Sequence, residues 1–238
     1  MTPVFDFEKA WLLKLSNAID SSAGKAFRRK VLKGSEEFTD QTPRSEIIEW
    51  TAKIVDKLES HSGKAETHRI MTLCACRYPT SGLQKARELW EETGDIDCVL
   101  DLLQKQFENF IRDTLDLTED EIEYVVSRNM GLAGVRQGNT IIATKIPKSG
   151  FLKEYLNEKD SKKRIEYYCH CPRVRDAVKT GYTVPASFCY CGAGFYKGIW
   201  EDILQMPVEV EVIESLFTGG DVCRIAIHLP VDNASVNL

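Results

Sequence analysis

Closely spaced cysteines are the feature of this sequence that could do chemistry. Three pairs have the spacing C-x-C: Cys74 with Cys76, Cys169 with Cys171, and Cys189 with Cys191. Thiolates are ligands of zinc and of iron–sulfur clusters, and they are also nucleophiles and redox groups. The pattern therefore predicts a metal site, a reactive thiol or a reversible disulfide, and the spacing alone leaves all three open.

The positions of two pairs favour a shared metal site. The two side chains of a C-x-C pair point to opposite faces of a strand and lie about 200° apart on a helix, so both reach one ion only where the backbone turns. Cys171 precedes Pro172, where a strand is expected to end and a helix to begin, and Cys191 precedes Gly192. We expect zinc, or alternatively iron, and the predicted ligands are Cys169, Cys171, Cys189, Cys191 and Cys223. Whether Cys74 and Cys76 join this site is left open.

Cys171 is also the candidate catalytic residue. A cysteine at the N-terminus of a helix gains a stabilised thiolate from the helix dipole. Arg173 and Arg175 follow it closely and add positive charge. His170, between two cysteines, is expected to lie outside the set of ligands, and Cys98 is expected to be a buried apolar thiol on a helix.

Composition excludes some partners. The 238 residues carry a net charge of −5, which argues against nucleic acid because phosphate binding needs a basic face. No apolar run approaches the length of a membrane span, and acidic residues near the start do not resemble a secretory signal. We therefore expect a cytoplasmic protein with no membrane or nucleic-acid partner, whose cysteines are not structural disulfides. The sequence leaves open whether the chain forms a homodimer.

The elements that must position the cysteines change character near residue 131. Apolar residues at helical spacing predict helices over residues 5–19, 42–60, 81–94, 95–115 and 118–129. Thr42 with Pro43 and Thr118 with Glu121 are predicted to begin two of them. Beyond residue 131 we expect strands at 139–147, 162–170, 207–215 and 221–230, helices at 172–181 and 188–204, and a hairpin turn at 216–221.

The predicted fold class is α+β. Residues 1–130 form a helical region, and residues 131–238 form an α/β domain with an antiparallel sheet and helices on one of its faces. The cysteine pairs of the second part lie where its strands and helices meet, which is where functional sites are usually built.

The stretch from Phe188 to Leu229 resembles the 4-vinyl reductase-like (V4R) domain family. The matching motifs are Gly194–Gly198, a Gly-aromatic-x-x-Gly helix, and Gly220–Arg224, a Gly-Asp-x-Cys-Arg segment followed by Ile225 where phenylalanine is usual. The resemblance implies an α/β domain related to haem-NO-binding domains. It also implies a small-molecule ligand and, as in several members, a structural zinc.

The zinc ligands of that family carry over only in part. The resemblance implies Cys189 and Cys223 as ligands, but the third family cysteine would fall at Ser215 and a family glutamate near Val212. The usual site is therefore incomplete here. We expect the additional cysteines at 169, 171 and 191 to replace the missing ligands.

A second resemblance points to an enzyme. The pattern "CPRVRDAV" followed by "GGDVCR" is similar to the L-2-amino-thiazoline-4-carboxylic acid hydrolase-like family, whose recurrent cysteines would be Cys171, Cys189 and Cys223. The sequence thus leaves three hypotheses: a small-molecule-binding protein with a cysteine-rich metal site, a hydrolase of a cyclic amidine or amide, and a thiol redox protein.

Overall fold

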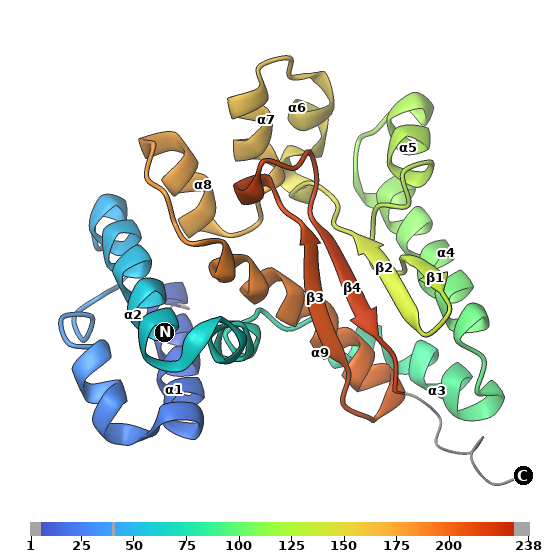
Figure 1. Cartoon of the computed structure of the whole chain (residues 1–238). Helices are drawn as coiled ribbons and strands as arrows, with labels where there is room; N and C mark the ends of the chain where they lie inside the picture. The colour runs from blue at the N-terminus through green and yellow to red at the C-terminus, as the bar shows by residue number, and fades with distance from the viewer. Residues whose placement is uncertain (1–5, 40, 231–238) are drawn as a thin grey trace, which may run out of the picture. The chain divides into compact units, whose positions relative to one another are not determined.

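The computed structural model describes residues 6–39 and 41–230, with Lys162 and Phe217 described by their backbone alone. Residues 1–5, 40 and 231–238, which belong to the predicted regions 1–130 and 131–238, lie outside this description. The fold is α+β: the chain begins with long helices, and a four-stranded sheet lies in the later part (Figure 1). Among the described residues, no helix is long and apolar enough to cross a membrane.

The chain divides into two compact units, each made of two segments. The first unit consists of Met1–Cys76 and Lys159–Gly194, and the second consists of Arg77–Glu158 and Phe195–Leu238. The predicted boundary at residue 131 falls inside the second unit. It coincides instead with the point where helical sequence gives way to strands.

The first unit is helical in its described residues. It contains α1 (Phe7–Val31), α2 (Arg44–Leu73), α7 (Ser161–Tyr168), α8 (Pro172–Thr180), the 3₁₀ helix η3 (Ala186–Cys189) and the first turn of α9 (Tyr190–Leu204). The Asp6 side chain accepts a hydrogen bond from the Lys9 amide and so caps α1. Apolar residues at helical spacing, including Trp11, Leu15 and Ile19, are buried as the sequence predicts.

One predicted helix start in this unit is wrong. Pro43, not Thr42, occupies the N-cap position of α2, and no side chain caps this helix. The Thr42 hydroxyl instead accepts a hydrogen bond from the Thr39 amide, 2.9 Å away, within the preceding turn. A short polar side chain can hydrogen-bond a nearby backbone group in a turn as well as at a helix cap. Here the Thr42 side chain forms the hydrogen bond within the turn.

The second unit begins with a 3₁₀ helix, η1 (Thr80–Gly82), and three α-helices that precede its sheet. The α-helices are α3 (Gln84–Thr93), which ends at the left-handed Gly94, α4 (Ile96–Thr114), which is capped by Asp95, and α5 (Glu119–Val126). Thr118 and Glu121 form the predicted capping box of α5. Two short helices, η2 (Ser149–Phe151) and α6 (Leu152–Asn157), close the first segment of the unit.

The sheet of the second unit is antiparallel, with strand order β1-β2-β4-β3. Its strands are β1 (Val135–Gln137), β2 (Thr140–Thr144), β3 (Glu209–Glu214) and β4 (Arg224–His228), and Figure 1 shows β4 between β2 and β3. β2, β3 and β4 lie within predicted strands, whereas β1 was not predicted. The β3–β4 connection holds the predicted turn together with a 3₁₀ helix, η4 (Leu216–Thr218).

The predicted strand at 162–170 is wrong, because residues Ser161–Tyr168 form the helix α7. The Asp160 side chain accepts from the Lys163 amide and caps this helix. Ile165 and Tyr168 are three residues apart and lie on one helical face, and Tyr168 is fully buried. The tyrosines and isoleucine that suggest a strand by residue type are therefore arranged at helical spacing.

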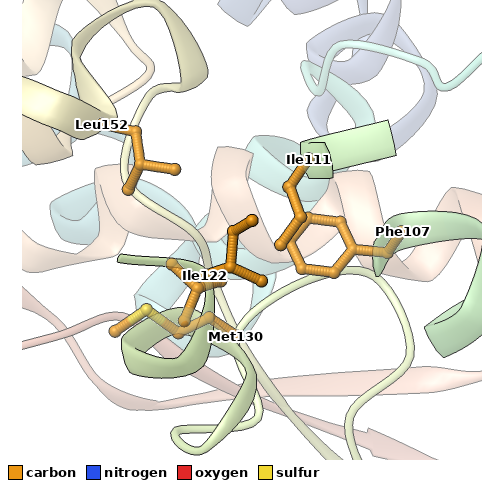
Figure 2. Packing of buried hydrophobic residues seen from close by; sticks show 6 residues of the cluster. Phe107, Ile111, Ile122, Met130 and Leu152 are labelled. Carbon is orange, nitrogen blue, oxygen red and sulfur yellow. The ribbon is translucent and has the colours of Figure 1, made fainter. Parts of the chain in front are cut away.

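The core next to the sheet is built by α4, α5 and the segments after them. Figure 2 shows Phe107 and Ile111 of α4 near Ile122 of α5, Met130 and Leu152, all of them buried. Gly131 fits against this cluster because a Cβ atom there would lie 2.8 Å from the Phe107 ring. The second unit therefore joins residues from both sides of position 131 in one core.

Candidate functional site

The structure brings most of the predicted cysteines into one unit. Cys169, Cys171, Cys189 and Cys191 belong to the first unit, as does Cys74, whereas Cys223 belongs to the second. All eight cysteines of the chain are thiols and none forms a disulfide. Cys171, Cys189 and Cys191 are half-buried, while Cys74 and Cys169 are buried.

Cys171 occupies the predicted position at the start of α8. It is the N-cap residue, with extended backbone, and Pro172 follows as the first helical residue. Its side chain makes no capping hydrogen bond to the helix. The sulfur therefore lies at the positive end of the helix dipole and is not engaged by the helix's own amides.

The neighbour of Cys171 on α8 is an arginine without any exposed surface. The Arg173 guanidinium lies 3.8 Å from the centre of the Trp11 ring, and it forms an ion pair with Glu8, which is equally buried. Burial lowers the pKa of Arg173, while the charges of Glu8 and, next in size, of Cys171 oppose this effect. An arginine remains protonated under such conditions, so a positive charge lies inside the unit.

Glu8 is shared by two arginines. Arg44 donates to it through Nη1 at 2.5 Å, and Arg44 also donates through Nε to Asp176 of α8 at 2.7 Å. Two positive and two negative side chains thus form one network that ties α1, α2 and α8 together. Partial burial lowers the pKa of Arg44, but its two acidic partners outweigh this effect, so the pKa is raised.

Arg173 still has N–H groups that the network does not use. Among the described residues, its Nε and Nη1 atoms have no hydrogen-bond acceptor, and both are closed to solvent. Buried donors are nearly always satisfied, so these two atoms are unusual. The negative charge of Cys171 or Cys191, when its thiol is ionised, acts to raise the pKa of this guanidinium.

Cys74 joins the same neighbourhood from α2. Burial raises the pKa of the Cys74 thiol strongly, and the charge of Cys191 raises it further. Its Sγ donates to the Ile70 carbonyl at 3.3 Å. A Cβ atom at Gly194 would clash with the Thr72 carbonyl, so this glycine lets the start of α9 approach the end of α2. Because burial raises its pKa so strongly, Cys74 is the unreactive member of the group.

A second polar cluster holds η3 against α2. The Ser187 hydroxyl lies 2.5 Å from Glu59 Oε1 and 3.0 Å from His68 Nε2. The His68 ring stacks on Tyr190, with 3.6 Å between ring centres. Burial lowers the pKa of His68, although Glu59 acts in the opposite direction. A serine that donates to Glu59 must accept from the neutral imidazole, so the proton of His68 lies on Nε2.

The predicted metal ligands do not form a metal-binding arrangement. In residues 6–39 and 41–230, no three side chains of histidine, cysteine, aspartate or glutamate are arranged to hold an ion. Cys223 lies one residue before β4, and burial raises its pKa. The prediction of zinc or iron at Cys169, Cys171, Cys189, Cys191 and Cys223 therefore stays a prediction, and no step of the chemistry below depends on it.

Sequence reasoning missed the charged and hydroxyl partners of the thiols. Glu8 looks like an acidic residue in the first turn of a helix, and His68 belongs to no motif. No local pattern identifies them, because their partners lie far away in the chain. Cys98 was predicted to be buried and is exposed; its thiol donates to Asp95, which raises its pKa. His170 is exposed.

Comparisons with known proteins add one family. Residues 154–233 match the model of a family of unknown function (DUF6144). No curated protein and no solved structure matches the chain. The matched stretch contains Arg173 and all five cysteines predicted as ligands, so it covers the part of the chain in which the thiols are concentrated. The V4R and thiazoline hydrolase resemblances stay expectations.

Proposed function

We propose that this protein acts on a small molecule by thiol chemistry, with Cys171 as its nucleophile and Arg173 as the positive group that favours the thiolate. The observation that carries the proposal is the fully buried guanidinium of Arg173, two residues after Cys171. In the part of the chain that the structure describes, its Nε and Nη1 have no hydrogen-bond acceptor, and the charge of an ionised Cys171 or Cys191 would raise its pKa. A nucleophilic cysteine works as its anion, and a nearby cation is the usual way to favour that anion.

The exposure of the thiols supports Cys171 rather than Cys74. Cys171 is half-buried, so a substrate can reach it, whereas Cys74 is fully buried. Arg173 itself has no exposed surface, and this leaves no room for a separate anion beside it. The guanidinium is therefore proposed to act on the sulfur and not to bind a substrate carboxylate. A carbonyl or amidine carbon is the kind of electrophile that such a thiolate attacks, which agrees with the hydrolase hypothesis.

A redox role is the second candidate, because Cys191 interacts with the same guanidinium as Cys171. Two thiols at one cation can form a reversible disulfide. Both roles need a reduced resting thiol, so the proposal includes the cytoplasm as the compartment. A metal ion held by these thiols remains a separate proposal, and the experiment below distinguishes it.

The test is site-resolved alkylation by iodoacetamide at neutral pH, followed by mass spectrometry. We expect Cys171 to react about tenfold faster than Cys76, an exposed cysteine of the same unit, since a tenfold larger thiolate population gives a tenfold faster reaction. Cys74 should be the slowest. A Cys171 that labels as slowly as Cys74, with and without chelator, would contradict the proposal.

A matched pair of variants assigns the effect to Arg173. The double variant Glu8→Gln/Arg173→Gln removes both charges together, so that no lone charge remains buried. It should slow Cys171 about tenfold and leave Cys76 unchanged. Lys179→Gln removes a positive charge from the last turn of the same helix and should change neither rate. If Cys171 labels slowly until a chelator is added, Cys171 is a metal ligand rather than a nucleophile. A Cys171–Cys191 disulfide formed with oxidised glutathione would favour the redox role.

A further inference from the structure

The second unit contains a cavity that the thiol chemistry does not use. Its volume is about 420 Å³, within the range of sites for small ligands. It lies where the end of α3, the start of α4, the β1–β2 turn and the end of α9 meet. Its lining combines an apolar side with a polar side.

The apolar side consists of Trp90, Leu204 and Met206. Met206 is 40% exposed, which is unusual for an apolar side chain that lines a cavity without filling it. It follows Gln205, which has a left-handed backbone (φ 54°) and ends α9. An aromatic ring beside a flexible thioether is a surface that adapts to an apolar group of a ligand.

The polar side holds the cation Arg136 and the anion Asp95, and a second anion, Asp97, pairs with Arg136. Arg136 donates through Nε to the Gly138 carbonyl and through Nη1 to Asp97, both at 3.0 Å. These two hydrogen bonds orient the guanidinium and leave its Nη2 group available. Asp95 accepts from the Asp97 amide at 2.8 Å, and such backbone hydrogen bonds lower its pKa, so it is an anion at neutral pH.

We infer that this cavity binds an amino acid with an apolar side chain, or a zwitterion of the same chemistry. The ligand carboxylate pairs with Arg136, its ammonium pairs with Asp95, and its side chain lies against Trp90 and Met206. A ligand with only a carboxylate would be repelled by Asp95 and Asp97, and a ligand with only an ammonium group would be repelled by Arg136. A ligand that carries both charges satisfies the cation and the anions together.

The first experiment compares L-phenylalanine with its two singly charged analogues by calorimetric titration of the full chain. Phenethylamine lacks the carboxylate, and 3-phenylpropionate lacks the ammonium. We expect L-phenylalanine to bind and each analogue to bind at least about tenfold more weakly, because each loses a charge-assisted hydrogen bond. Equal affinity for all three compounds, or no binding of any apolar amino acid at millimolar concentration, would overturn the inference.

Variants assign the binding to this cavity. Asp95→Asn keeps a good N-cap for α4 while it removes the charge, and Arg136→Gln removes the cation. Each should weaken L-phenylalanine binding by about tenfold or more. Arg128→Gln, which removes an arginine that lies over Tyr124 and does not line the cavity, should leave binding unchanged. Fluorescence of Trp90 should respond to the ligand, and Trp90→Phe should abolish the response. Binding that all of these variants leave intact would show a different site.

Discussion

The pairing of Glu8 with Arg173 shows what single residues contribute to this protein. The two are 165 positions apart in the chain, and both side chains are fully buried. Ionised groups are costly to bury unless they are paired, so the charge of each residue explains why the other can be buried. Within the described residues, two nitrogen atoms of Arg173 nevertheless have no hydrogen-bond acceptor, which is a cost that packing does not explain. The proposed interaction with thiolates gives these donors a function.

His68 makes a pH-dependent contribution to stability whose sign follows from its surroundings. Burial lowers its pKa in the folded protein below the ordinary value of 6.5, with Lys64 acting in the same direction and Glu59 against it. The unfolded chain therefore binds a proton at a pH where the folded chain does not. Stability should fall as the pH decreases through about 6.5, and the loss should end below the folded pKa.

Urea unfolding of the wild type and of His68→Gln between pH 7.5 and pH 5 measures this contribution. Glutamine has no proton to gain and keeps an amide that can donate to Ser187. The wild type should lose more stability than the variant over this interval. Parallel pH profiles would mean that His68 does not titrate differently in the two states. The subtraction is needed because carboxyl groups also begin to titrate at the acidic end.

The sequence allowed part of the candidate site to be predicted at this scale. Cys171 as the cap of α8 follows from the order cysteine, proline and amphipathic helix, which is a local pattern. Glu59, Ser187 and His68 were not predicted, because their hydrogen bonds join positions 119 and 128 residues apart. Local patterns carry no information about such pairs. The burial of Cys98 was also predicted wrongly, because it depends on which face of α4 packs against the core.

Elements defined by caps and spacing were predicted well, and elements defined by residue type were not. The capping box of α5 and the left-handed glycines after α3 and α8 lie where expected. The strand predicted at 162–170 was wrong. The tyrosines and isoleucine of this segment favour strands on average, but the cap at Asp160 and the helical spacing of the buried face favour a helix. The short strand β1 offers only three residues, too few for a recognisable pattern.

The packing of α9 on α2 gives a prediction about an element. A methyl group at Gly194 would clash with the Thr72 carbonyl, which is backbone and cannot turn away as a side chain can. Gly194→Ala should therefore lower the free energy of unfolding by about 1–3 kcal/mol, even though alanine favours helices. Thermal and urea unfolding measure the change.

The matched control for this variant is Gly150→Ala. Gly150 has no atom within 4 Å of the position that a Cβ would occupy, so the added methyl group meets nothing. Its effect should be small or stabilising, since alanine restricts the unfolded chain more than glycine does. If Gly194→Ala proved as well tolerated as Gly150→Ala, the close approach of the two helices would be refuted.

At the scale of the whole molecule, the order of elements in the sequence differs from their grouping in space. Each unit is made of two separate segments, the second unit's Arg77–Glu158 spans the middle of the chain, and the last passage from the first unit to the second lies within α9. A boundary near residue 131 follows from the change in composition there. The contacts give a different division, because Leu152, which follows residue 131, shares a core with residues of α4 and α5, which precede it.

The arrangement predicts that residues 131–238 will not fold by themselves. This fragment lacks five of the six buried members of the core cluster in Figure 2, namely Phe107, Ile111, Ile122, Val125 and Met130. It also begins at Gly131, which in the whole chain packs on the Phe107 ring and accepts a hydrogen bond from the buried Tyr196 hydroxyl at 2.9 Å. A fragment that loses most of its core cannot offset the entropy of ordering its chain. Circular dichroism should show no cooperative thermal transition for it, whereas the full chain in the same buffer should unfold cooperatively. A sharp transition and a dispersed NMR spectrum for the fragment would instead restore the boundary near residue 131 as a true division between domains.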